Sequence, residues 1–349
     1  MTKKLNVAVI GAGMIGDAHV DCIRKDGRGE VSWLVARSDK TVTEKLAKHG
    51  IARGSTDYRD VLDDDEVDAV VIASPPNTHL AILADALAAG KHVLLEKPMV
   101  ATRPQLRRLL AAVKQHPRQL VLECSCRHAR LQPKFRFVKS IIDRGEIGKV
   151  YHIHHNHLVR TTFLDWNPKG AWALRKALAG GGPFFDWGVY DLSFHLGLLS
   201  DKPQIAKVHA FTKRGLKSFS DPSIRSDIEQ HGAAYLEFSS GLTYYYERGA
   251  GVHLTAANET RISGTRGGLR LAFCSWDSPD VEVFTVDSSG QGQREVRQVD
   301  VSAHTDDNLE LTRHFFDCVL GRAKPMMPVT LAAKHLDILF RIYESAAKR

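Results

Sequence analysis

The sequence predicts two domains: an α/β Rossmann-type domain with a doubly wound parallel sheet over residues 1–123, and an α+β domain with a large, mainly antiparallel open sheet over residues 124–349. The first observation is length, because 349 residues exceed the usual size of one domain. The second is that short apolar runs alternate with helical stretches as far as residue 123. The third is the two-residue alternation beyond that point, which is typical of antiparallel strands with one face in water.

The predicted elements follow this division. In the first domain we expect strands at 5–10, 31–36, 69–73, 93–95 and 120–124, and helices at 14–25, 40–48, 79–89 and 105–113. In the second we expect strands at 150–160, 205–213, 233–239, 242–248, 252–263, 268–273, 281–286 and 294–299. Its expected helices cover 133–144, 183–199, 309–320 and 331–347.

Composition narrows the class of protein. A hydrophobic content of 43% and a charged content of 25% are typical of a soluble globular chain. The net charge of +8 is spread along the chain rather than gathered in a basic tract, so no nucleic-acid partner is predicted. No apolar run is long enough to cross a membrane, and the start runs directly into a strand rather than a targeting segment. Five cysteines without Cys-x-x-Cys spacing predict reduced thiols and a cytoplasmic location.

A glycine motif follows the first predicted strand and opens the first helix. Gly11 permits the tight turn, Gly13 lets the backbone approach a pyrophosphate, and Gly16 lets the helix pack on the strand. The positive end of the helix dipole then faces the anion. Together with the intervening Met14 and Ile15, these residues are predicted to bind a dinucleotide. A glycine-rich turn without a ligand is the alternative.

The end of the second strand predicts which cofactor binds. An acidic residue there selects NAD through the ribose 2′-hydroxyl, but this chain has Ala36, Arg37 and Ser38 at that point. Arg37 and Ser38 suit a 2′-phosphate, so NADP is the preferred cofactor and NAD remains possible. In the alternative, Arg37 is a solvated surface residue and Asp39 serves NAD.

Two further loops lie at the carboxyl edge of the predicted sheet, where ligands bind in such folds. The residues expected at the cofactor there are Ser74, Pro75, Asn77, His79, Glu96 and Lys97. Lys97 is expected near the nicotinamide, where its fixed positive charge can act on a substrate oxygen. The alternative is a lysine that is merely solvated.

A glycine-rich turn opens the helix expected at 183–199. Pro183 suits its first position, and Asp186 and Tyr190 are four residues apart and share a face. A carboxylate beside a phenol is a candidate pair for moving a proton. A buried tyrosine bonded to a neighbouring acid is the structural alternative. Asp191 and His195 form a rival pair with the same spacing.

Four histidines crowd one predicted strand. His152 and His154 should point to one face, and His155 and His157 to the other. No cysteine or acid lies among residues 151–158, so we predict no metal site and favour histidines that line the substrate site or a subunit interface.

Taken together, the motifs resemble the Gfo/Idh/MocA family of oxidoreductases, which includes glucose–fructose oxidoreductase, inositol dehydrogenase and dihydrodiol dehydrogenase. The matching segments follow the family's order over nearly the whole chain: GAGMIG with Asp17 and His19, SPPNTH, EKP, Arg127, IDRGEIGKV, Trp172, GGGPFFDWGVY, ISGTRGGLRL and IYESAAK.

The resemblance implies roles for individual residues. Lys97 matches the catalytic lysine of the EKP motif, and Asp186 and Tyr190 fall on the family's D-x-G-x-H stretch. The last position is tyrosine here, as in some active members, and Ser193 replaces an acid often found three residues later. Arg127 and Trp172 are further expected at the cofactor; residues expected at the substrate are His154, Trp166, Tyr190 and His195.

The resemblance also implies the activity. We expect an NAD(P)-dependent dehydrogenase or reductase that moves a hydride to or from a hydroxyl or carbonyl carbon of a sugar, glycoside, polyol or related cyclic alcohol. A homodimer or homotetramer through the C-terminal sheet is expected as well. Two alternatives share the fold: an NAD-dependent glycosidase, and a catalytically silent protein that senses a nucleotide.

Overall fold

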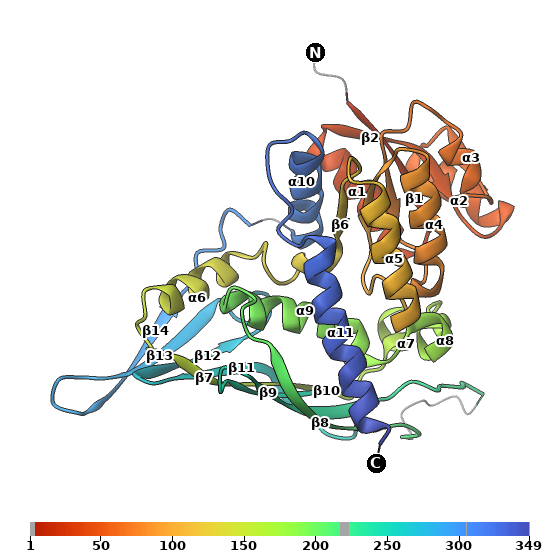
Figure 1. The fold of residues 1–349 in the computed structure, drawn as a ribbon. Coiled ribbons are helices and arrows are strands. Elements are labelled where there is room, and N and C mark those ends of the chain that lie inside the picture. The colour runs from red at the N-terminus through yellow and green to blue at the C-terminus, as the bar shows by residue number, and fades with distance from the viewer. Residues whose placement is uncertain (1–3, 217–222, 305, 349) are drawn as a thin grey trace. The chain divides into compact units, whose positions relative to one another are not determined.

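The computed structural model describes residues 4–216, 223–304 and 306–348. The chain divides into two compact units (Figure 1). The first comprises Met1–Arg127, Ala177–Gly180 and Thr305–Lys334, and the second comprises His128–Lys176, Gly181–His304 and His335–Arg349. Each is described separately.

The first unit is built on a parallel sheet in the order β3-β2-β1-β4-β5-β6. Its strands are β1 (Leu5–Ile10), β2 (Gly29–Val35), β3 (Arg53–Ser55), β4 (Ala69–Ile72), β5 (His92–Leu95) and β6 (Val121–Glu123). The strand order reverses between β1 and β4, and this is the point at which ligands bind in doubly wound sheets. The predicted Rossmann architecture is confirmed.

Helices α1 (Met14–Asp26), α2 (Asp39–His49), α3 (Arg59–Leu62), α4 (Pro76–Ala88) and α5 (Arg103–Gln115) connect these strands. The unit also takes in α10 (Asp307–Val319), which packs on α1. The ring of Phe316 on α10 packs against Gly29, because a Cβ built on Gly29 would lie 2.6 Å from that ring. The first compact unit therefore extends beyond residues 1–123, the range expected from the sequence.

The second unit contains an eight-stranded sheet in the order β14-β13-β12-β11-β7-β10-β9-β8. The strands are β7 (Val150–Val159), β8 (Ile205–Lys213), β9 (His231–Phe238), β10 (Thr243–Ala250), β11 (Ala256–Gly264), β12 (Gly267–Ala272), β13 (Asp280–Val286) and β14 (Gly292–Gln298). Neighbours are antiparallel except β10 with β7. The predicted, mainly antiparallel sheet is confirmed.

Helices of the second unit cover one face of this sheet. Both α6 (Pro133–Asp143) and α9 (Pro183–Leu198) lie on that face, with α9 packed on β9 and β10 (Figure 1). The second unit also contains α7 (Phe163–Trp166) and η2 (Ala171–Leu174). Of the other helices, η1 (Cys124–Cys126) belongs to the first unit, and α8 (Lys176–Ala179) and α11 (Val329–Ala346) each have residues in both. Among the described residues, none of these helices is both long and apolar enough to span a membrane.

Candidate active site

The first and third glycines of the motif are explained by contacts within the protein. A Cβ on Gly11, whose φ is +112°, would lie 2.6 Å from the carbonyl carbon of Ala73. A Cβ on Gly16 would lie 2.0 Å from the carbonyl oxygen of Gly11. Any side chain at either position would separate α1 from the loops that surround its N-terminus.

No contact with another described residue requires glycine at the second position of the motif, Gly13. Gly13 is the N-cap of α1, no side chain caps the helix, and a Cβ built there meets nothing within 4 Å. The first turn of α1 therefore presents backbone N–H groups to open space, where Met14 is 60% exposed. A pyrophosphate fits this arrangement, since backbone donors and the helix dipole both favour an anion.

Ser38 has a structural role as well as its predicted one. Its Oγ caps α2 by accepting a hydrogen bond from the N–H of Thr41 at 3.3 Å. Ala36 is buried at the end of β2, whereas Arg37 is exposed. A guanidinium and a serine thus lie together at the carboxyl end of β2.

The loop between β4 and α4 is held by its own hydrogen bonds. The hydroxyl groups of Ser74 and Thr78 lie 2.7 Å apart, and the Nε2 of His79 lies 2.7 Å from the carbonyl oxygen of Ser74. Burial lowers the pKa of His79. The Oδ1 of Asn77 is buried and has no hydrogen-bond partner among the described residues. An acceptor left without a donor at this sheet edge fits a ligand that supplies one, and Pro75, the N-cap of α4, fixes the loop beside it.

Glu96 is the centre of a buried charged cluster. Its Oε1 lies 2.6 Å from Nη1 of Arg127 and 2.9 Å from Nε2 of His19, and its Oε2 accepts the backbone N–H of Lys97 at 3.0 Å. Burial alone would raise the pKa of Glu96, but Arg127 and His19 outweigh it and hold that pKa well below its usual value. The carboxylate thereby fixes the backbone from which Lys97 projects.

Among the described residues, this cluster also contains a group of side chains that are close enough together to hold a metal ion. Ligand atoms of His19, Glu96 and Cys124 lie within 4.8 Å of one another. The guanidinium of Arg127 already pairs with that carboxylate, and burial raises the pKa of the Cys124 thiol well above its usual value, which disfavours the thiolate that a metal needs. We assign no metal here.

In the second unit, α9 is capped by a distant acid. The carboxylate of Glu229 accepts hydrogen bonds from the backbone N–H of Gly182 at 2.8 and 2.9 Å and from that of Phe184 at 3.2 Å. It also accepts the hydroxyl of Tyr343 at 2.7 Å. Cβ atoms on Gly181 and Gly182 would come within 2.2 Å of the Tyr343 hydroxyl and 2.0 Å of the Glu229 carbonyl oxygen. The glycine-rich turn is thus a point of close approach, and its partners are Glu229 and Tyr343.

Tyr190 lies in an aromatic cluster at the middle of α9. Its ring is 4.8 Å from that of His128, which it meets edge-on, and 5.5 Å from that of Trp187. Asp186 is half-buried one turn earlier on the same face of α9. His128 carried no recognisable signal in the sequence.

The remaining predicted residues are divided between the units. Lys97 and Arg127 belong to the first, and Asp186 and Tyr190 to the second. The second unit also carries the two predicted tryptophans, Trp166 at the end of α7 and Trp172 on η2. The pairing of Lys97 with Tyr190 stays a prediction.

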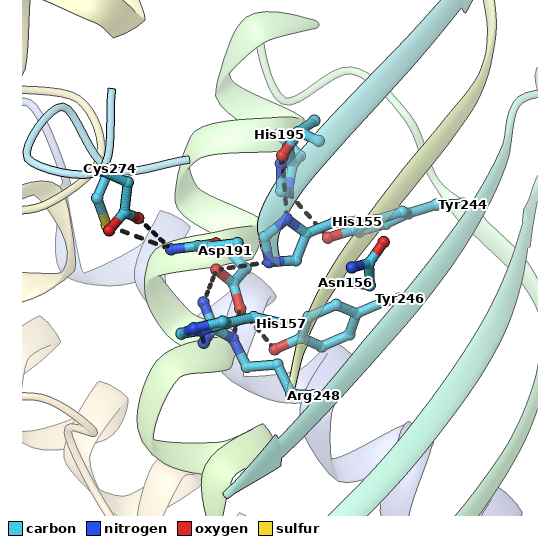
Figure 2. Close-up of polar contacts among 12 residues, drawn as sticks. His155, Asn156, His157, Asp191, His195, Tyr244, Tyr246, Arg248 and Cys274 are labelled. Atoms are coloured by element: carbon cyan, nitrogen blue, oxygen red, sulfur yellow. Dashed lines mark hydrogen bonds and ion pairs between the residues drawn. The ribbon is translucent and has the colours of Figure 1, made fainter. Parts of the chain in front are cut away.

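The side chains of Asp191 and His195 are hydrogen-bonded to different partners. Figure 2 shows the Asp191 carboxylate held by Arg248 and Tyr246, while His195 is bonded elsewhere. The ring nitrogens of His195 lie 2.9 Å from the Thr260 hydroxyl and 2.8 Å from the Tyr244 hydroxyl. Both Asp191 and His195 are 0% exposed. His195 is thus held by two hydroxyl groups within the core, which fits a structural role, and its suggested place at the substrate stays a prediction.

The Asp191–Arg248 pair is fully formed. Arg248 donates to Asp191 from Nε and, at 2.7 Å, from Nη2, and Tyr246 donates to the same carboxylate at 2.7 Å. Despite burial, Arg248 lowers the pKa of Asp191 to about 2, so the carboxylate stays ionised. The guanidinium also lies 4.9 Å from the ring of Trp187, which connects the pair to the cluster around Tyr190.

The histidine-rich strand β7 divides between the two faces as predicted. His155 is buried on the α9 side, where its Nδ1 lies 3.0 Å from the Thr260 hydroxyl, and Nδ1 of His157 lies 2.8 Å from Nη1 of Arg248. His154 contacts Tyr245, at 4.7 Å between ring centroids, on the opposite face. The structure thus places His154 on the face of the sheet opposite α9, which carries Tyr190, and its suggested place at the substrate stays a prediction.

The buried imidazole of His195 predicts acid lability. Burial lowers its pKa from 6.5 to about 4. Between these values the unfolded chain binds the proton and the folded chain does not, so the free energy of unfolding falls as the pH falls through this window. We expect His195 alone to cost about 2 kcal/mol at pH 5 relative to pH 7, measured by urea unfolding.

The variant His195→Gln tests this assignment, because glutamine keeps hydrogen-bonding groups but does not titrate. Its loss of stability between pH 7 and pH 5 should be smaller by the same amount. His209→Gln is the matched control, since that side chain is 58% exposed. An unchanged pH dependence in His195→Gln would contradict the prediction.

The fold and the site define a class of protein: a dinucleotide-binding domain coupled to a C-terminal open-sheet domain. Comparison with known families agrees. Residues 5–123 match the oxidoreductase family with an NAD-binding Rossmann fold, GFO_IDH_MocA, and residues 135–270 match the GFO/IDH/MocA C-terminal domain. The chain belongs to the GFO/IDH/MocA family, which confirms the family suggested by its motifs.

Individual relatives are named as oxidoreductases of sugars and cyclitols. The chain is 25% identical to D-xylose 1-dehydrogenase [NADP(+)] of Haloarcula marismortui over 88% of its own length and 80% of that protein. It is 31% identical to the uncharacterized oxidoreductase YrbE of Bacillus subtilis over 55% of its length and 52% of that protein. The alignment thus spans about half of YrbE, as it does of levoglucosan dehydrogenase of Pseudarthrobacter phenanthrenivorans, at 48%.

Solved structures share the whole fold. Levoglucosan dehydrogenase in complex with NADH and levoglucosan aligns with a TM-score of 0.82 at 19% identity, covering 99% of this chain and 98% of that one. GenD2 from gentamicin A biosynthesis, in complex with NAD, aligns with a TM-score of 0.80 at 26% identity, covering 99% and 95%.

Proposed function

We propose that the protein is an NAD(P)-dependent dehydrogenase or reductase that acts on a CH–OH group of a sugar, glycoside, polyol or related cyclic alcohol. The observation that carries the proposal is the uncapped N-terminus of α1 beside Gly13, in a chain whose relatives are sugar and inositol dehydrogenases. Asp186 and Tyr190 on α9 supply the acid–base groups that such a reaction needs.

The nicotinamide cofactor supplies the hydride chemistry, and the protein orients the substrate and moves one proton. Tyr190 accepts the proton of the alcohol as hydride leaves, and returns it in the reverse direction. Lys97 favours the ionised phenol and stabilises the charge that develops on the substrate oxygen. Asp186 orients these groups.

A panel of sugars and cyclic alcohols, screened with both nicotinamides at 340 nm, tests the proposal. Absorbance change with at least one substrate is the expected result. Cleavage of a chromogenic glycoside with no net absorbance change would favour the NAD-dependent glycosidase instead. Tight cofactor binding with no turnover of any kind would favour a nucleotide-sensing regulatory protein.

We further propose NADP(H) as the preferred cofactor, because Arg37 and Ser38 occupy the position at which an acid would select NAD. A charge-assisted contact to the 2′-phosphate is worth roughly one to two decades in affinity. Fluorescence titration with NADPH and NADH should show that preference, and Arg37→Ala should remove it. Arg59→Ala, at a side chain 64% exposed, is the control. Equal affinity of the unmodified protein for both cofactors would exclude the idea.

The face of the eight-stranded sheet opposite α9 is the surface we propose for homo-oligomerisation. A row of paired residues crosses this face from β8 to β13: His209, Tyr235, Tyr245, His154, Arg261, Arg270 and Glu282. Tyr235 is 40% exposed within it. Exposed aromatic and arginine side chains are enriched in subunit interfaces, which gives His154 a role that fits its position.

A further inference from the structure

The loop 273–279, between β12 and β13, is anchored by a buried lysine. Lys134 is 0% exposed, and its Nζ donates to the carbonyl oxygens of Ala272, Cys274 and Ser278 at 2.9, 3.1 and 2.5 Å. These three bonds use all the donors of the ammonium group. Lysine is rarely buried completely, because removing the charge from water is costly.

Two further side chains fix the same loop. The Oε1 of Gln132, also buried, accepts from the backbone N–H and the hydroxyl of Ser275 at 3.3 and 2.8 Å. The Nδ2 of Asn258 donates to the Asp277 carboxylate at 3.0 Å. Together with Lys134, these bonds hold the loop in one conformation.

The residue at the centre of this fixed loop is an exposed tryptophan. Trp276 is 58% exposed, although Lys134 and Gln132, which anchor its loop, are buried. Its ring lies 5.2 Å from the ring of His128, edge-on, and the ring of His128 lies 4.8 Å from that of Tyr190. The segment after Arg127 thus supplies two anchors of the loop, Gln132 and Lys134, and also the ring that connects Trp276 to Tyr190.

We propose that Trp276 is a stacking platform for a second sugar ring, so that the substrate is a glycoside of two or more rings rather than a free monosaccharide. The proposal rests on the proposed function, because Tyr190 fixes where the reacting ring lies. A rigid aromatic face exposed to water matches the C–H face of a pyranose, and little entropy is lost on binding since the loop is already ordered. The ring of His128 contacts those of both Trp276 and Tyr190, so the platform lies one aromatic ring away from the group that would bind the reacting sugar.

Steady-state kinetics with matched pairs of substrates test this: glucose with cellobiose, and xylose with xylobiose. For whichever pair is oxidised, Trp276→Ala should raise the KM of the disaccharide about tenfold and change that of the monosaccharide by less than about twofold. Trp276→Phe should restore part of the loss. Val286→Ala, at a side chain 61% exposed on β13, is the control and should change neither value.

A binding measurement separates this proposal from the proposed function. Calorimetric titration of the protein saturated with reduced cofactor should show cellobiose binding more tightly than glucose, and Trp276→Ala should abolish the difference. Cellobiose binding that depends on Trp276 without oxidation of any sugar would support the platform and overturn the dehydrogenase. Oxidation of sugars with equal effects of Trp276→Ala on both members of a pair would overturn the platform, as would a change in oligomeric state with unchanged KM values.

Discussion

Tyr190→Phe is expected to lower kcat by about 10²–10⁴-fold while leaving cofactor affinity nearly unchanged. The substitution removes only the hydroxyl that moves the proton. The ring stays between His128 and Trp187, so the aromatic cluster and the stability of the fold should be retained. Turnover is measured on the best substrate of the panel, and cofactor affinity by fluorescence titration. Tyr151→Phe, at a side chain 51% exposed, is the control.

Lys97→Met should cost at least as much as Tyr190→Phe. A phenol in water has a pKa of about 10 and is a poor base at neutral pH, and a nearby ammonium favours the phenolate. If Lys97 acts through Tyr190, the double variant should be little worse than the poorer single one. Multiplicative losses would show that the two residues act independently.

The alternative pair for proton transfer, Asp191 and His195, is tested by a variant of His195. His195 is bonded to Thr260 and Tyr244 in the core, so His195→Gln should keep near-normal turnover at neutral pH. Near-normal activity in Tyr190→Phe together with an inactive His195→Gln would show that His195, and not Tyr190, transfers the proton.

The sequence predicted most of the fold because the fold is encoded in local periodicity. The run at β4 is apolar throughout, and its burial on both faces follows from the helices that flank it. The short strand β3, Arg53–Ser55, was missed. Its three residues carry no apolar run, and they pair with β2 only because the sheet edge is already in place.

Residues of the site were predictable only where their positions follow from residues close to them in the sequence. The strand period correctly separated His154 from His155, and the glycine motif correctly located the N-terminus of α1. Glu229, 47 residues from the helix that it caps, gave no signal. For the same reason, the spacing of Asp191 and His195 suggested a pair, whereas the partner of Asp191 lies 57 residues away on β10.

Asp191→Asn is expected to lower the free energy of unfolding by about 3–5 kcal/mol, because it leaves the buried guanidinium of Arg248 without its counter-charge. Arg248→Met should cost a similar amount, since the ionised carboxylate of Asp191 then loses its guanidinium partner and keeps the Tyr246 hydroxyl and the nearby His155. Both variants are measured by urea unfolding at pH 7, where Asp191 is ionised in the unmodified protein.

The double variant distinguishes a buried ion pair from two separate packing positions. With Asp191→Asn and Arg248→Met combined, no unpaired charge is left in the core, so the total loss should be smaller than the sum of the single losses. The pair also lies beneath Trp187 and therefore beside Tyr190. Since these variants act on the packing of α9 and Tyr190→Phe acts on proton transfer, we expect the first two to lose stability and Tyr190→Phe to lose kcat at nearly full stability. Additive losses in the double variant, or a comparable loss of stability in Tyr190→Phe, would contradict this division of roles along α9.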